Sequence, residues 1–181
     1  MLQPLARFHP RFYHIGYVCR DMGRGIERLT ATQSTAAFKV VHVARGRSPA
    51  ESPIRRLALG QVGPLTLELV EASASAASIY SDALKEEELL QFHHVGYYID
   101  GADNWRALET WVERHGGPAS AGDIPGVLRY LYLDRRADLG HFLEYVQLEE
   151  GGLKLFGALP SSRLLSDMLS SSDPDQRGPA A

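Results

Sequence analysis

The 181-residue sequence contains a single cysteine, no excess of basic residues and no long apolar run. Cys19 alone cannot form a disulfide within the chain, and this favours a reducing compartment. The 19 Lys and Arg residues are outnumbered by 22 Asp and Glu residues, whereas a nucleic-acid-binding protein usually carries a basic excess. Neither the roughly 18-residue apolar run of a membrane-spanning helix nor the apolar segment of a signal peptide is seen. We therefore expect a cytoplasmic protein that binds a small molecule and neither nucleic acid nor membranes.

The sequence does contain an internal repeat, because three segments of the first half recur in the same order in the second half. The matched pairs are YHIGY at 13–17 with HHVGY at 93–97, RRLAL at 55–59 with RYLYL at 129–133, and LELVE at 67–71 with LEYVQ at 143–147. Three ordered matches at nearly constant spacing indicate a tandem duplication.

Each half shows the same order of local patterns, namely a strand, a helix and three further strands. Runs of β-branched and aromatic residues predict first strands at 12–19 and 92–99, and apolar residues at helical spacing predict helices at 22–32 and 103–115. The remaining strands are predicted at 38–45, 54–60 and 64–71, and again at 118–122, 127–134 and 140–149. We therefore expect an α+β fold of two tandem βαβββ modules that form one curved mixed sheet. The expected boundaries are 8–72 for the first module, 73–90 for a linker with a helix, 91–150 for the second module, 151–170 for a C-terminal helical extension and 171–181 for a disordered tail.

The repeat places one histidine in the first strand and one glutamate in the last strand of each half: His14, Glu68, His94 and Glu144. Both glutamates stand between apolar neighbours in strands whose pattern indicates burial. A buried carboxylate is costly unless it is paired or binds a cation, and two imidazoles with two carboxylates suit a divalent transition metal. We predict that the sheet curls around a cavity in which these four side chains bind one metal ion.

Strand alternation also makes predictions for their neighbours. His93 is expected to face away from the metal site, because adjacent residues of a strand point to opposite faces. Glu71 and Gln147 correspond to each other in the repeat and lie on the face opposite to Glu68 and Glu144. They are the second choice of ligands if the register differs by one residue.

With these motifs, residues 11–149 resemble the vicinal oxygen chelate superfamily, which includes glyoxalase I, methylmalonyl-CoA epimerase, extradiol dioxygenases and the fosfomycin- and bleomycin-resistance proteins. The resemblance implies that His14, Glu68, His94 and Glu144 bind a six-coordinate divalent ion (Zn, Ni, Co, Mn or Fe) whose remaining positions accept water or two neighbouring substrate oxygens. Extradiol dioxygenases and fosfomycin-resistance enzymes typically lack an acidic ligand at the position of Glu68. The sequence therefore resembles the glyoxalase I and epimerase branch more closely.

That branch implies a metal-dependent lyase or isomerase that abstracts a proton next to a carbonyl and stabilises an enediolate. Glu144 is the implied base, loosening from the metal as substrate binds, with Glu68 as the alternative. Four further side chains are candidate substrate contacts, namely Tyr98, Arg129, Tyr130 and Arg55. Three of them lie on strands that face or edge the expected cavity, and Arg55 matches Arg129 in the repeat, so that both could hold an acidic group of the substrate.

Two other functions stay open at this point. One is an Fe(II)-dependent extradiol-type dioxygenase, which would consume oxygen. The other is a non-catalytic protein that sequesters an aromatic or antibiotic ligand and needs no metal. For all three functions, the partner is a small molecule, and we expect the chain to form a homodimer.

Overall fold

The structure, a computed structural model, describes residues 5–33, 38–42, 52–62, 65–73, 77–85 and 87–157. The elements, in chain order, are η1 (Leu5–Phe8), β1 (Arg11–Cys19), α1 (Met22–Gln33), β2 (Lys39–His42), β3 (Ile54–Val62), β4 (Leu65–Ala72), β5 (Leu90–Tyr98), α2 (Ala102–Arg114), β6 (Ser120–Ile124), β7 (Leu128–Arg135), α3 (Arg136–Leu139), β8 (His141–Leu148) and α4 (Glu150–Gly157). The predicted α+β fold is confirmed, since strand, helix and three strands follow one another twice.

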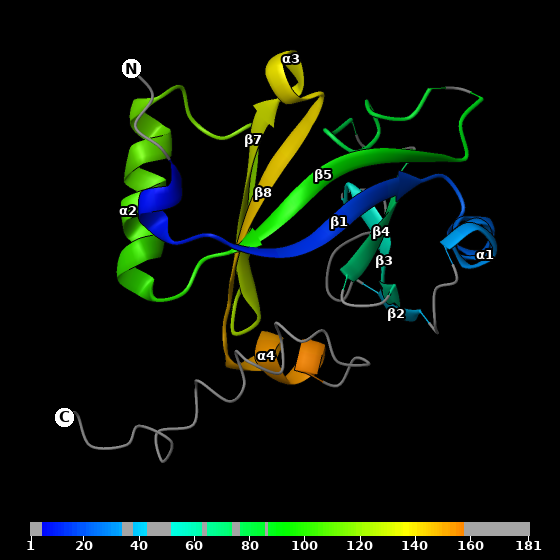
Figure 1. Ribbon diagram of the computed structural model, residues 1–181, viewed down its shortest axis with the longest axis horizontal. Coiled ribbons are helices and arrows are strands. Elements are labelled where there is room, and N and C mark those ends of the chain that lie inside the picture. Colours follow the sequence, from blue (N-terminus) through cyan, green and yellow to red (C-terminus); the bar gives the residue numbers. More distant parts are fainter. Residues whose placement is uncertain are drawn as a thin grey trace.

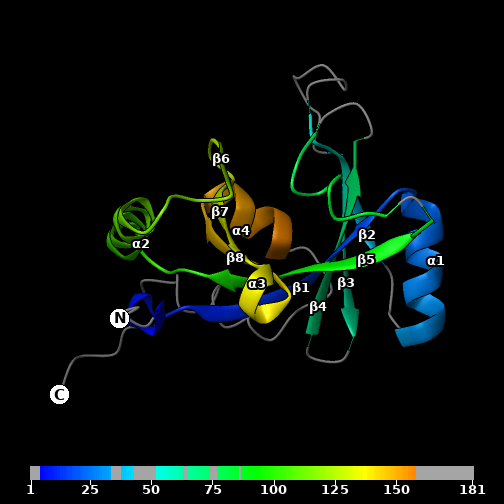
Figure 2. The same cartoon turned by 90° about the horizontal axis from the view of Figure 1, so that it is seen from above.

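In the part of the chain that the structure describes, one eight-stranded sheet contains both halves, in the order β2-β3-β4-β1-β5-β8-β7-β6. Within each half the first and last strands pair in parallel, β1 with β4 and β5 with β8, and the antiparallel pair of β1 and β5 joins the two halves. Figure 1 shows β1 and β5 crossing the middle of the molecule, with α1 and α2 at opposite ends. The view from above shows the strands of both halves crossing β1 and β5 at a steep angle, so that the sheet curls into a trough (Figure 2).

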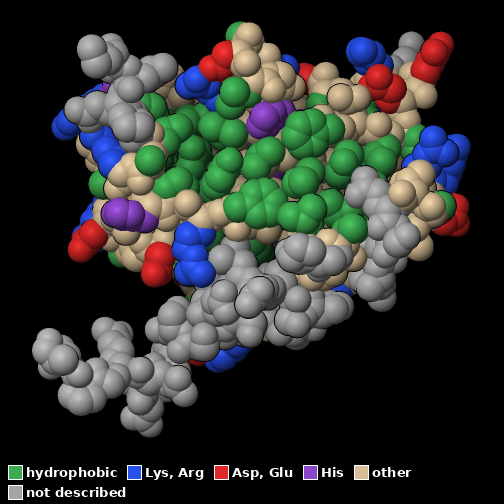
Figure 3. Space-filling view, in the orientation of Figure 1, with side chains coloured by type: hydrophobic (Ala, Val, Ile, Leu, Met, Phe, Trp, Pro, Cys, Tyr) green, Lys and Arg blue, Asp and Glu red, His purple; other side chains and the backbone are tan. Residues whose placement is uncertain are grey.

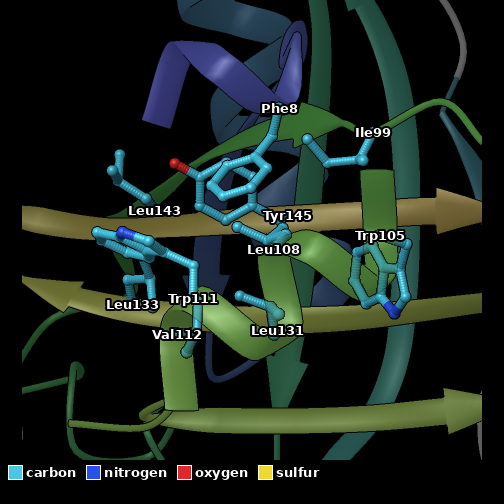
Figure 4. Close-up of a cluster of buried hydrophobic side chains, with 10 residues drawn as sticks. All are labelled: Phe8, Ile99, Trp105, Leu108, Trp111, Val112, Leu131, Leu133, Leu143 and Tyr145. Atoms are coloured by element: carbon cyan, nitrogen blue, oxygen red, sulfur yellow. The ribbon is translucent and has the colours of Figure 1, made fainter. Parts of the chain in front are cut away.

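Helix α2 covers the outer face of the second half. Its apolar residues are spaced to form one stripe, and they join residues of β7 and β8 in a buried cluster (Figure 4). This cluster includes Trp105, Leu108, Trp111 and Val112 of the helix and Leu131, Leu133, Leu143 and Tyr145 of the sheet. Because strand side chains alternate, Tyr132 and Glu144, which lie between these sheet residues, point to the inner face of the trough.

Helix α1 covers the outer face of the first half in the same way. Met22 and Leu29 pack with Leu67 and Leu69 of β4, which leaves Glu68 for the inner face. Burying each such side chain contributes about 1.5–3 kcal/mol, so the two helices fix which strand positions face the trough.

The linker differs from the prediction. The helix expected within 73–90 is not formed in its described part, which instead contains turns. The Ser81 amide donates to the Ser78 hydroxyl and the Ser81 hydroxyl donates to the Ser78 carbonyl. Such local side-chain bonds compete with helix formation.

At the C-terminal end the described chain stops with α4, which follows β8 directly. The rest of the expected helical extension and the expected tail at 171–181 lie outside the described residues. Among the described helices, none has the length and apolar character needed to cross a membrane.

Candidate metal centre

Four adjacent strands at the centre of the sheet each contribute one candidate ligand. In the order β4-β1-β5-β8, these are Glu68, His14, His94 and Glu144. All four residues are buried, with His94 completely inaccessible, and their ligand atoms lie within 4.8 Å of one another. The structure therefore brings together the four side chains that the repeat singles out.

The donor atoms are crowded in a way that suits a cation. The Nε2 atoms of His14 and His94 are 2.9 Å apart. Oε2 of Glu144 lies 2.8 Å from Nε2 of His14 and 3.4 Å from that of His94, and Oε2 of Glu68 lies 3.5 and 3.0 Å from the same two atoms. Ligands that bind one ion at right angles, each about 2.1 Å away, are separated by about 3.0 Å.

The hydrogen bonding of the cluster also fits a metal. Oε2 of Glu144 is buried and has no hydrogen-bond partner among the described residues, although both imidazoles are close to it. A buried carboxylate oxygen without a donor is costly, and a divalent ion among the four donor atoms would remove that cost. Two neutral imidazoles and two carboxylates form a donor set typical of Zn, Ni, Co, Mn or Fe.

Two glycines of the repeat make room for the histidines. Gly96 lies opposite His14, and Gly16 opposite His94, in the antiparallel pair of β1 and β5. A Cβ added at either glycine would overlap the imidazole of the opposite histidine. The His-x-Gly motif thus works across the two halves, because the glycine of each half accommodates the histidine of the other. Sequence reasoning missed this role, although the matched glycines of the repeat were its signal.

Two β-bulges shape the inner face beside the histidines. The register of β1 and β5 shifts between Phe12 and His14, and again where Gly16 pairs with His94 but Tyr17 pairs with Phe92. Tyr13 and His93 are the extra residues at the two bulges. A bulge interrupts strict alternation, and Nδ1 of His93 consequently lies 2.9 Å from Nδ1 of His94. The prediction that His93 faces away from the site was wrong for this reason.

The charges in the cluster determine which groups hold protons when no metal is bound. Burial opposes a charge on His14, but Glu68 and Glu144 outweigh it and raise the pKa of His14 from 6.5 to about 10. The pKa of His94 is raised for the same reason. Burial also opposes ionisation of Glu144, yet the positive charges of the nearby His94 and His14 hold its pKa below the ordinary value. When no metal is bound, the imidazoles of His14 and His94 are therefore protonated and positively charged.

His93 behaves in the opposite way. Burial and the neighbouring His94 lower the pKa of His93 from 6.5 to about 4. Its ring is therefore neutral at physiological pH and is 2% exposed.

A cavity of about 420 Å³ opens from the metal cluster along the trough. His14, Glu68 and Glu144 lie in its wall, together with apolar side chains of β3, β4, β7 and β8. Four tyrosines also line it, namely Tyr13, Tyr80, Tyr130 and Tyr132. Burial, and then the charge of Glu144, raise the pKa of Tyr132 well above 10, so this hydroxyl keeps its proton. An apolar wall with a few polar groups at one end is typical of a small-molecule site.

The predicted substrate contacts lie at different places. Tyr130 lines the cavity. Tyr98 is buried and donates its hydroxyl proton to Asp100 at 3.3 Å. Arg129 forms ion pairs with Asp123 and Glu149, both at 3.5 Å, and Arg55 is exposed. Tyr98, Arg129 and Arg55 are not among the described residues that line the cavity.

Glu71, the second-choice ligand, has a different partner. Its carboxylate accepts two hydrogen bonds from Arg56, at 2.6 and 2.8 Å, and one from the amide of Met22 at the start of α1. Hydrogen bonding to Arg56 lowers the pKa of Glu71. This carboxylate is thus satisfied on the outer face and stabilises the contact between α1 and the sheet.

Comparison with known proteins identifies the fold. No protein-family model matches the chain, and a search of curated proteins found no matching sequence. Among solved structures, methylmalonyl-CoA epimerase from Mycobacterium tuberculosis matches 82% of this chain and 92% of its own, with a TM-score of 0.56 and 15% identity. The chain has the fold of the methylmalonyl-CoA epimerases. A single-residue variant of the Streptomyces coelicolor epimerase, in complex with 2-nitronate-propionyl-CoA, matches 76% of this chain and 96% of its own, with a TM-score of 0.54 and 19% identity.

A hypothetical protein from Bacillus halodurans C-125 gives a similar match, covering 78% of this chain and 96% of its own with a TM-score of 0.55 and 13% identity. These matches confirm the predicted resemblance at the level of the fold.

Proposed function

We propose that this protein is a metal-dependent enzyme of the glyoxalase and epimerase type, which abstracts a proton from the carbon next to a carbonyl of a small molecule. One observation carries the proposal: two imidazoles and two carboxylates from four different strands meet at the end of a cavity of about 420 Å³. The fold shared with methylmalonyl-CoA epimerases supports the same class of reaction.

His14, Glu68, His94 and Glu144 would hold one divalent ion, namely Zn, Ni, Co, Mn or Fe. When bound, such an ion supplies Lewis-acid stabilisation of the negative charge that develops on two neighbouring substrate oxygens. The apolar walls of the cavity exclude water and thereby strengthen this electrostatic stabilisation.

Glu144 is the proposed base, and Glu68 is the alternative. A carboxylate bound to a metal is a weak base, so it must loosen before it can accept a proton. The two glutamates differ in the residue opposite them, which is Tyr132 for Glu144 and Leu59 for Glu68. Tyr132, whose hydroxyl keeps its proton, would therefore orient the Glu144 carboxylate for proton transfer.

Tyr130 is the proposed substrate contact from the cavity wall. Its ring lies 6.0 Å from that of Tyr132 in an edge-to-face arrangement, so the two aromatic side chains together form part of the wall near Glu144. Because Tyr98, Arg129 and Arg55 are not part of the described lining, a role for them in substrate binding would require movement of their strands or side chains.

The proposal is tested by metal content and by exchange of hydrogen with solvent. Elemental analysis of the purified protein is expected to find one divalent ion per chain, which is lost in His94→Ala. The metal-loaded protein is expected to introduce deuterium from ²H₂O into the carbon next to the carbonyl of thiohemiacetals or acyl thioesters, as followed by NMR. A fully active metal-free protein would refute the proposal.

The same preparations separate the other two functions. An extradiol-type dioxygenase would consume oxygen when Fe(II) and catechols are added. A sequestering protein would keep its ligand affinity after treatment with a chelator and in His14→Ala. The proposed enzyme is expected to give neither result.

We further propose that the chain forms a homodimer through the outer face of β1 and β5. Figure 3 shows a broad apolar surface over these strands. Phe12 of β1 and Phe92 of β5 are 40% and 37% exposed. Tyr97 packs edge to face against Phe12, and Tyr17 packs in the same way against Phe92. An exposed apolar patch of this kind is typical of a protein–protein contact.

A further inference from the structure

The bulge in β5 places a second histidine directly behind one of the candidate ligands. His94 presents Nε2 to the cluster, 3.0 Å from Oε2 of Glu68, and its other nitrogen, Nδ1, lies 2.9 Å from Nδ1 of His93. Nε2 of His93 in turn lies 3.0 Å from the carbonyl oxygen of Ile79. A chain of hydrogen bonds therefore runs from the cluster through two imidazoles to the backbone of the linker.

The carbonyl oxygen of Ile79, which ends this series of hydrogen bonds, determines the direction of each of them. A carbonyl oxygen only accepts, so Nε2 of His93 must carry the proton and donate it to Ile79. In a neutral imidazole the other nitrogen is then an acceptor. Nδ1 of His93 thus accepts from Nδ1–H of His94. Nε2 is then the His94 nitrogen that is left to bind a metal ion, and it faces Glu68 and His14.

Packing holds the His93 ring in this orientation. The ring stacks on Phe142, with centroids 4.8 Å apart and an interplanar angle of 29°, and lies 5.3 Å from Tyr80 on another side. With two aromatic contacts and hydrogen bonds at both nitrogens, His93 has little freedom to turn away from His94.

The first half of the repeat lacks this arrangement. Tyr13 occupies the position that corresponds to His93, and its ring packs edge-on against His14 with centroids 4.8 Å apart. Nδ1 of His14 is buried and has no hydrogen-bond partner within the described part of the chain. His14 and His94 occupy matching positions of the repeat, but they differ in the hydrogen bonding of Nδ1.

We propose that His93 is a positioning residue that fixes the orientation and the Nδ1–H tautomer of His94, and so makes His94 the more firmly held of the two imidazole ligands. This inference rests on the proposed function. Hydrogen-bond partners behind a ligating histidine orient the ring and raise its basicity, and losing one typically weakens metal binding by about 10–100-fold.

The experiment compares Zn²⁺ affinity, measured by competition with a chromogenic chelator, in the wild-type chain and three variants. His93→Phe keeps a ring for packing but removes both nitrogens, and it is expected to lower Zn²⁺ affinity by about 10–100-fold. His93→Asn retains an acceptor near the position of Nδ1 and is expected to recover most of the loss. His141→Phe, a histidine of the neighbouring strand β8 outside the cluster, is the matched control and is expected to bind as the wild type does.

Histidine ¹⁵N NMR of the metal-free wild-type chain provides a second readout that needs no variant. A proton on Nδ1 of His94 and on Nε2 of His93 is expected. A proton on Nδ1 of His93 overturns the inference, as does wild-type Zn²⁺ affinity in a folded His93→Phe variant. If the wild-type chain does not bind Zn²⁺ or any other divalent ion, the proposed function fails, and the NMR assignment then decides the role of His93 by itself.

Discussion

Gly96 is the position at which a single added methyl group is expected to destroy the metal site without unfolding the protein. The residue lies opposite His14 in the pair of β1 and β5, and the imidazole of His14 lies over its backbone. A Cβ at Gly96 would be 2.5 Å from Nε2 of His14, the candidate ligand atom.

The size of the effect follows from two distances. Non-bonded carbon and nitrogen atoms pack at about 3.5 Å, so Nε2 must retreat by about 1 Å to accept the new methyl group. A metal site tolerates errors of only about 0.2 Å in its ligand distances. The expected cost in folding free energy is about 1–3 kcal/mol, as for other overpacked cores, whereas metal affinity is expected to fall by at least the roughly 10–100-fold seen when the support of a ligand is lost.

The assay is metal content by elemental analysis together with thermal unfolding of the metal-free protein. Gly23→Ala is the matched control, because the nearest atom to an added Cβ there is 3.4 Å away, at Oδ1 of Asp21. It is expected to retain the metal and to be as stable as the wild type or more so. A folded Gly96→Ala variant that keeps one ion per chain at wild-type affinity would show that the imidazole does not occupy the described position.

Three further predictions concern charge and assembly. The pKa of His14 is raised to about 10 from an ordinary 6.5. Protonation of His14 therefore stabilises the metal-free protein fully below pH 6.5, and this contribution is lost as the pH rises towards 10. In calorimetric scans, the melting temperature of the metal-free protein is expected to fall between pH 7 and 10, while that of the Zn²⁺-loaded protein stays level. Glu71→Gln weakens the contact with Arg56 and is expected to lower the free energy of unfolding, measured in urea, by about 1–3 kcal/mol. The number of metal ions per chain is expected to stay the same, and loss of the metal would identify Glu71 as a ligand. Phe12→Glu places a charge on the outer face of β1 and is expected to shift the protein from dimer to monomer in sedimentation velocity; a wild-type chain that is already monomeric would refute the proposed homodimer.

The repeat in the sequence was sufficient to predict the fold and to select four candidate ligands. Duplicated segments of similar pattern form similar local structures, and a matched His and Glu in each half must take related positions in any fold that preserves the symmetry. Alternation along strands, which depends only on neighbouring residues, correctly separated Glu68 from Glu71.

Other features depend on contacts between distant strands and could not be derived from local patterns. The bulge at His93 arises from the register of β5 against β1, and it alone turns this histidine towards His94. The space for each imidazole comes from a glycine of the opposite half, which becomes visible only once the two strands are paired. The sequence by itself determined which side chains are available for metal binding, because identity and periodicity are local properties. The tertiary structure decided which groups stand behind and beside those side chains, because register is set by the packing of the whole sheet.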